Sequence, residues 1–425
     1  MRTGARVGRA RAGDQFDLGP EVALPSRFSY LSRMFRYGIR LAIAAALASS
    51  ACSSPAKPVK HAHKTKPQPA EKTALEQAHE AEAGGEMDEA DAKYLAAYNQ
   101  TKTFEMLSER VQFLIRAGRA TKATEAAKAY YDANVSDTRG IGLYADALLA
   151  ADNGSEAFER AKEMIDVNKD DPSAHEKKGR ALMLLDKSDD GIDELRKAVH
   201  LAPKDPTYHI SLGNALIKLG KVDEAALEYR EAIKFESDHA EPFVLLGGAL
   251  RLQGENDEAK EQIDKAIKLD PRNGRAYFEL GLLLNAQKKQ GEAEQALARA
   301  VQLSPNESLF WYAYGEIFRL SERFDEAISA YKKAVDLDPP YPKALTKLGL
   351  LLAERKQYDE AEVVLTQAVR RDGKNPANYL PLGVVYAAKR KPKQAIENYE
   401  LFLKYAPKND PDRGRVTNAI NELKH

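Results

Sequence analysis

The chain has 425 residues, of which 30% are charged and 43% hydrophobic, with 64 Lys and Arg against 64 Asp and Glu. The net charge of zero gives no support for electrostatic binding of nucleic acid. The single cysteine excludes an intrachain disulfide, a multi-cysteine zinc site and an iron–sulfur cluster. Length alone allows two or three domains.

The charge is unevenly distributed along the chain. Residues 1–70 carry 12 Lys and Arg against three Asp and Glu, which leaves 52 basic and 61 acidic residues in 71–425. The main body therefore has a net charge of about −9, which is typical of a soluble, mildly acidic protein.

Residues 34–51 have the three parts of an export signal. Basic residues 34–40 precede an apolar run, 41–48, and small residues 49–51 come directly before Cys52. The apolar run is too short to span a bilayer, which takes about 20 residues. The segment resembles a bacterial lipoprotein signal, which implies that Cys52 is acylated and begins the mature protein. The alternative is an ordinary secretory signal with an incidental cysteine.

The segments on either side of this signal show no apolar periodicity. Residues 1–33 are interpreted as a start-site extension, because Met34 could begin the signal, or as a long basic leader. Residues 52–70 join the acylated cysteine to a Pro/Lys-rich segment, for which we predict a disordered tether. His61 and His63 lack a third metal ligand nearby and are expected to be solvated.

A strict 34-residue repeat fills most of the remaining chain. Glycine recurs at this period seven times: Gly179, Gly213, Gly247, Gly281, Gly315, Gly349 and Gly383. With units starting at residues 172, 206 and every 34 residues onward, glycine is position 8, alanine occupies most of positions 20 and 27, and proline is frequent at position 32. Large apolar residues recur at positions 4, 7, 11 and 24.

The spacing of these positions predicts two amphipathic helices in each unit, because positions 4, 7, 8 and 11 share one helical face, as do 20, 24 and 27. Glycine within a helix costs about 0.5–1 kcal/mol relative to alanine, so its recurrence indicates a close approach of the two helices. Gly220, Gly254 and Gly291 are expected to form the turns between them.

These units resemble tetratricopeptide repeats. The resemblance implies an all-α fold, a right-handed α-solenoid of about ten helix–turn–helix repeats with a C-terminal capping helix. Residues 71–171 would form degenerate repeats, 172–409 seven regular repeats, and 410–425 the cap. Pro381 lies inside a first helix and is expected to kink or shorten it.

No motif indicates catalysis. The pairs His79-Glu80 and His175-Glu176 start like a zinc-peptidase motif, but the position of its second histidine is occupied by Ala83 and Gly179. The chain also lacks a phosphate-binding loop and a G-x-S-x-G element. We predict no enzyme activity, no cofactor, no metal site and no small-molecule substrate, and expect His175 and His209 to be packed at position 4.

The family resemblance assigns positions 2, 5, 9, 12 and 13 to the inner, concave surface. Apolar residues at positions 5 and 9 predict an exposed apolar stripe with arginine anchors at position 12. The predicted partner-binding residues are Ile210, Asn214, Val244, Arg251, Phe278, Leu282, Tyr312, Arg319, Leu350, Leu380 and Val384. On this hypothesis, removing the Phe278 and Tyr312 side chains weakens partner capture and leaves stability nearly unchanged.

Together these patterns predict a non-enzymatic scaffold of the bacterial envelope. It would be anchored through Cys52 to the outer membrane, facing the periplasm, and bind an apolar peptide or helix of a protein partner in the concave groove, with no nucleic acid bound. By fold analogy, the task would be assembly of a secretin, pilus or polysaccharide export complex. The alternatives are a soluble cytoplasmic adaptor or co-chaperone, and a groove filled by the chain's own terminus or by self-association.

Overall fold

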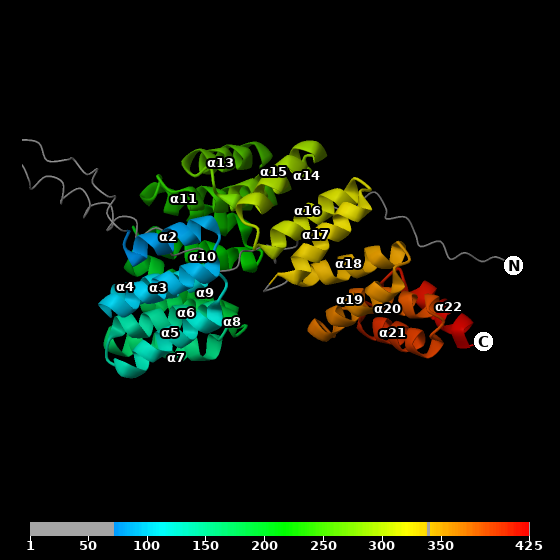
Figure 1. The fold of residues 1–425 in the computed structure, drawn as a ribbon, viewed down its shortest axis with the longest axis horizontal. Helices are drawn as coiled ribbons and strands as arrows, with labels where there is room; N and C mark the ends of the chain where they lie inside the picture. Colours follow the sequence, from blue (N-terminus) through cyan, green and yellow to red (C-terminus); the bar gives the residue numbers. More distant parts are fainter. Residues whose placement is uncertain (1–71, 338–340, 425) are drawn as a thin grey trace, which may run out of the picture. The chain divides into compact units, whose positions relative to one another are not determined.

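The structure is a computed structural model that describes residues 72–337 and 341–424. The described residues form two compact units, 72–242 and 243–424. They contain 21 helices and no strand (Figure 1). The export signal, Cys52 and the tether lie outside the described residues.

Residues 72–242 contain ten complete helices and the start of an eleventh. The ten are α2 (Ala74–Gly84), α3 (Met87–Thr101), α4 (Phe104–Arg116), α5 (Ala120–Ala133), α6 (Thr138–Ala150), α7 (Gly154–Val167), α8 (Pro172–Leu184), α9 (Ser188–Leu201), α10 (Pro206–Lys218) and α11 (Val222–Phe235). Helix α12 (Ala240–Gln253) begins in this unit and continues into the next.

Residues 243–424 contain the rest of α12 and ten further helices. These are α13 (Asn256–Leu269), α14 (Gly274–Ala286), α15 (Gln290–Leu303), α16 (Ser308–Leu320), α17 (Phe324–Asp336), α18 (Pro342–Glu354), α19 (Tyr358–Arg371), α20 (Pro376–Ala388), α21 (Pro392–Tyr405) and α22 (Arg413–Lys424).

Consecutive helices from α2 to α21 form ten helix–turn–helix pairs, and α22 follows the last pair. The first helices from α4 to α20 begin 34 residues apart, so the repeat register extends upstream to residue 104. The predicted all-α solenoid of about ten repeats is confirmed. Buried Val416 and Ile420 of α22 pack with Tyr399 and Phe402 of α21, which covers the apolar face of the final pair.

The glycine at position 8 lets the two helices of a repeat approach closely. A Cβ atom added to Gly213 would lie 2.5 Å from the Tyr229 ring, and one added to Gly281 would lie 2.6 Å from Leu297 Cγ. In all seven regular repeats the nearest side chain belongs to the residue 16 positions later, at position 24. The predicted close approach is confirmed, because no Cβ atom fits at such distances.

Helix starts and turns repeat in the same register. Aspartate or asparagine immediately before a first helix accepts a hydrogen bond from its first turn, as Asp171 does from Ser173 N at 2.9 Å and Asp205 from Thr207 N at 3.1 Å. The turn residue at position 15 has a positive φ, as in Gly220 (71°) and Gly254 (85°).

The prediction for Gly291 was wrong, because this residue lies inside α15 and Lys288 (φ 61°) forms that turn. Pro381 is buried within α20. This helix is 13 residues long, the same length as α18, so the expected shortening does not occur.

Four position-4 side chains form hydrogen bonds to the backbone as well as packing contacts. His175 and His209 are buried, as predicted, and each contacts a backbone carbonyl six residues upstream through Nε2, at 2.8 and 3.0 Å. Trp311 donates to Pro305 O at 2.8 Å and Tyr379 to Gly373 O at 2.7 Å in the same way. These hydrogen bonds satisfy carbonyl groups at the ends of the preceding repeats.

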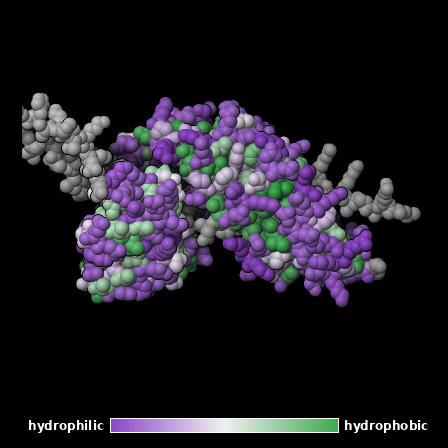
Figure 2. All heavy atoms as spheres, viewed as in Figure 1, coloured by the Kyte–Doolittle hydropathy of each residue, from purple (hydrophilic) through white to green (hydrophobic). Residues whose placement is uncertain are grey.

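Figure 2 shows hydrophilic residues over much of the visible face, with hydrophobic residues in smaller areas between them. Ion pairs join second helices of neighbouring repeats, such as Arg196 with Glu224 at 3.0 Å and Lys332 with Glu360 at 2.7 Å. Because both pairs are exposed, each contributes at most about 1 kcal/mol.

Candidate partner-binding recess

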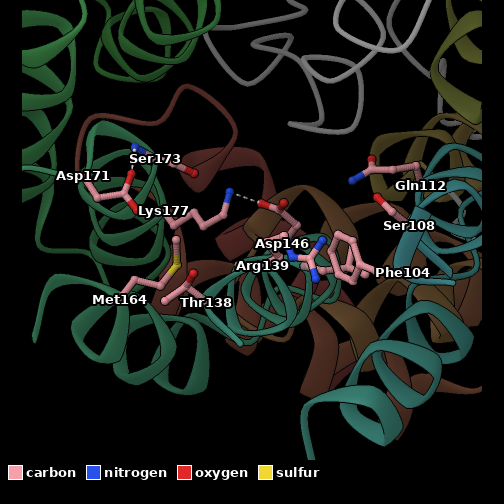
Figure 3. Close-up of a pocket in the computed structure, with 12 residues that line it drawn as sticks. Phe104, Ser108, Gln112, Thr138, Arg139, Asp146, Met164, Asp171, Ser173 and Lys177 are labelled. Carbon is pink, nitrogen blue, oxygen red and sulfur yellow. Dashed lines mark hydrogen bonds and ion pairs between the residues drawn. The ribbon is translucent and has the colours of Figure 1, made fainter. Parts of the chain in front are cut away.

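A recess of about 360 Å³ lies between the first helices of three successive repeats, α4, α6 and α8 (Figure 3). It is lined by Phe104, Ser108, Gln112, Thr138, Arg139, Gly142, Leu143, Asp146, Met164, Asp171, Ser173 and Lys177. Arg139 and Ser173 occupy position 2 of their repeats, Ser108 and Gly142 position 5, and Gln112 and Asp146 position 9. These positions belong to the set that the family resemblance assigns to the concave surface.

Gly142 lines the recess at position 5. The other repeats have a side chain at position 5, including Ile210, Val244 and Phe278. A Cβ atom added to Gly142 would lie 3.4 Å from Met164 Cε and 3.6 Å from Lys177 Cε, which are ordinary contacts. An alanine would therefore fit here, unlike at Gly213, whereas a larger side chain would extend beyond these contacts.

A buried ion pair crosses the recess. Lys177 Nζ lies 2.7 Å from Asp146 Oδ1, and both side chains are buried (Figure 3). The adjacent Glu176 is buried with Arg180 Nη1 at 3.1 Å, and it accepts a hydrogen bond of 2.9 Å from Ser211 Oγ. Burial alone would raise the pKa of Glu176, but Arg180, Lys177 and Ser211 hold it below its ordinary value. Each buried charge thus has a partner on the same or a neighbouring repeat.

The charge at the rim of the recess is also paired. Arg139 donates hydrogen bonds to Asp137 at 3.0 and 3.2 Å, and its guanidinium lies 4.7 Å from the centre of the Phe104 ring. These hydrogen bonds from Arg139 lower the pKa of Asp137 to about 2. The guanidinium group of Arg139 is therefore held at the rim, and the carboxylate of Asp137 balances its charge.

Four polar side chains of the recess have unused hydrogen-bonding capacity. Ser108, Gln112, Thr138 and Ser173 make no side-chain hydrogen bond to any of the residues that the structure describes. Gln112 is only 8% exposed. Figure 3 shows the polar ends of Ser108 and Gln112 pointing into the space between α4 and α8. Since a ligand that covers these groups would remove water from them, one that pairs with them through polar groups of its own is favoured.

The predicted exposed apolar stripe was wrong for five of its residues. Four side chains at position 5 and the leucine at position 9 of the fourth regular repeat are buried: Ile210, Val244, Phe278, Tyr312 and Leu282. Two of these side chains pack directly against an aromatic ring in, or immediately before, the next repeat. The Phe278 ring stacks on Phe310 with centroids 4.5 Å apart, and Tyr312 lies 4.7 Å from Tyr341.

The remaining predicted residues divide into two groups. Asn214, Arg251 and Arg319 already have partners, since Asn214 accepts from Tyr229 at 2.8 Å, Arg251 pairs with Glu279 at 3.1 Å and Arg319 with Glu316 at 2.9 Å. Leu350 is 36% exposed, and Leu380 and Val384 are half-buried. None of these six residues lines the recess described above, and their role in partner binding stays a prediction.

Sequence reasoning missed the recess because it treated the units at 104 and 138 as degenerate. Extending the repeat numbering to these two units would have indicated it. Gly142 stands at position 5, where several other repeats have a large residue, and the polar residues Gln112 and Asp146 stand at position 9. The contacts of Lys177, at position 6, could not be predicted from its place in the repeat.

The described residues offer neither a metal centre nor a membrane span. No group of three or more His, Cys, Asp or Glu side chains in this part of the chain could hold a metal ion. None of the helices α2–α22 combines the length and the apolar character that crossing a bilayer requires.

Comparisons with known proteins agree with the repeat architecture. A tetratricopeptide-repeat model matches residues 144–206, 178–241, 210–259 and 245–308, and the model of the middle TPR-like domain of cilia and flagella-associated protein 70 matches 299–402. A search of curated proteins by sequence found no match.

Solved structures match at low sequence identity. A chain of the APC/C hetero-tetramer Cut9–Hcn1 is 15% identical with a TM-score of 0.52, over 80% of this chain and 60% of that one. This chain therefore spans less than two thirds of that protein's length. Yeast Tom70 is 15% identical with a TM-score of 0.49, over 83% of this chain and 95% of that one. The TPR protein YrrB is 22% identical with a TM-score of 0.39, and the match covers 47% of this chain and 100% of that one.

The fold and its repeated helix pairs define an α-solenoid, a class whose stacked repeats form extended binding surfaces. With the 34-residue register and the family matches, they support the tetratricopeptide-repeat family for this chain.

Replacing Phe278 and Tyr312 together by alanine should lower stability strongly, contrary to the expectation from sequence, because both side chains are 2% exposed. Emptying one large aromatic site costs about 3–5 kcal/mol. Urea unfolding followed by circular dichroism measures the change. Leu350→Ala is the control and should cost less than about 1 kcal/mol. An unchanged midpoint for the double variant would show that these side chains do not form core contacts.

Proposed function

We propose that this chain is a non-enzymatic scaffold that binds a segment of a protein partner in the recess between α4, α6 and α8. The observation that carries this proposal is the recess of about 360 Å³ itself, whose lining includes the polar side chains of Ser108, Gln112, Thr138 and Ser173. Ligand sites are typically hollows of about 300–1,000 Å³ with a few convergent polar groups. The recess fits that description on the surface that the repeat register assigns to binding.

The partner's segment binds through polar contacts at this recess, which replaces the apolar peptide expected from sequence. The position-5 side chains that suggested an apolar stripe are packed between repeats and offer little surface. The hydroxyl and carboxamide groups of the recess can bind a partner without rearrangement of that core.

We further propose that the scaffold is displayed on the bacterial envelope by a lipid on Cys52. The basic segment, the short apolar run and the small residues before Cys52 support this proposal. Assembly of a secretin, pilus or polysaccharide export complex is the role suggested by analogy with other envelope repeat proteins. The competing hypothesis is a cytoplasmic adaptor or co-chaperone, in which residues 34–52 carry no signal.

Gly142→Leu should place a side chain in the recess and reduce partner capture by at least about tenfold. That change corresponds to a loss of about 1.4 kcal/mol of binding free energy. Gly142→Ala is the matched control, because its Cβ atom makes only ordinary contacts. Chemical crosslinking in intact cells, followed by quantification of the adducts of each variant, measures capture. Capture is normalised to the folded fraction of each variant, because the leucine side chain would also press on Met164 and Lys177. Equal capture by the leucine and alanine variants would rule out the recess as the binding centre.

Metabolic labelling with radioactive palmitate tests the anchor. The parent protein should be labelled and sediment with membranes, whereas Cys52→Ser should be unlabelled and lose the membrane association. An unlabelled parent, or a Cys52→Ser form that stays in the membrane pellet, would contradict the lipid anchor and favour the cytoplasmic hypothesis.

A further inference from the structure

We infer that the recess receives an uncharged carboxamide side chain, glutamine or asparagine, from an extended segment of the partner. This inference rests on the proposed function and names the chemistry that the recess selects. It follows from the charge balance of the lining residues and from the unused capacity of Gln112.

Charged ligand groups are disfavoured because the charges of the recess are already paired. Lys177 and Asp146 neutralise each other at 2.7 Å, and Arg139 is held by Asp137 at 3.0 Å. Asp171 accepts the backbone N–H of Ser173 at 2.9 Å as the cap of α8. A carboxylate or ammonium group entering this space would lose its hydration and meet no unpaired counter-charge.

A purely apolar ligand is disfavoured for the opposite reason. The Gln112 side chain is 8% exposed and has no hydrogen-bond partner among the described residues. An apolar group would remove the remaining water from it and from the Ser108 hydroxyl, and would leave their donors and acceptors unsatisfied. The binding free energy would then have to offset that desolvation.

A carboxamide supplies what both of these ligands lack. It carries two N–H donors and a carbonyl acceptor at fixed spacing, so it can pair with the Gln112 carboxamide through two antiparallel hydrogen bonds. The hydroxyl groups of Ser108, Thr138 and Ser173 can each donate or accept, and therefore complete the remaining hydrogen bonds. The volume of about 360 Å³ leaves room for main-chain atoms next to the inserted side chain.

Four pools of fluorescein-labelled nine-residue peptides test this selectivity on the purified full chain. The pools share mixed flanking residues and differ only in the central residue, which is Gln, Glu, Lys or Leu. Fluorescence anisotropy should show the Gln pool binding at least about fivefold more tightly than each of the others, as expected for one net hydrogen bond. A Glu, Lys or Leu pool that binds as tightly as the Gln pool, or no binding by any pool, would overturn the inference.

Two variants tie any preference to the recess. Gln112→Leu should abolish the advantage of the Gln pool, whereas Gln262→Leu should preserve it, because Gln262 is equally buried at 8% exposure but lies on α13. An advantage that survives in Gln112→Leu would also overturn the inference. If Gly142→Leu blocks partner capture while the pools show a different preference, the proposed function stands and only the carboxamide chemistry fails.

Discussion

The contact between the position-8 glycine of one helix and the position-24 side chain of its partner is the constraint on which this fold depends. A Cβ atom at Gly213 would lie 2.5 Å from the Tyr229 ring, so any other residue would force the helices apart. Because the contact recurs in seven repeats, the two helices of each repeat approach closely at the same pair of positions. The helical cost of glycine, about 0.5–1 kcal/mol each, is offset by the burial that this approach permits.

The same close packing decides which side chains remain for binding. With the helix pairs so near, the large residues at position 5 become contacts between repeats, as the stacked rings of Phe278 and Phe310 show. The recess lies where position 5 carries only small residues, Ser108 and Gly142. The polar groups around it are positioned by three different first helices, so the recess depends on the stacking of repeats rather than on any single one. The ion pair between Lys177 and Asp146 links two of these helices across it.

Much of the fold could be predicted from the sequence because the repeat itself encodes it. The 34-residue period, the small residues at positions 8, 20 and 27 and the aspartates before first helices each correspond to a local packing or capping requirement. The binding surface was harder to predict. The exposure of a side chain depends on how closely neighbouring repeats pack, and the 34-residue pattern does not specify that distance. Phe278 and Leu350 both stand at positions assigned to the concave surface, yet one is core and the other exposed. Local conformation was also predicted incompletely. Gly291 lies near a turn, but Lys288 is the residue with the positive φ.

Site-specific photocrosslinking tests most directly whether a partner enters the recess. A photoreactive amino acid placed at position 108, on the wall of the recess, should give a discrete protein adduct on irradiation of intact cells. The same amino acid at position 329, an exposed site on the second helix α17, serves as the control and should not give this adduct. A partner band that depends on position 108 is the predicted result. Identical adducts from both positions, or no adduct from position 108, would contradict the assignment of the recess as the partner-binding centre.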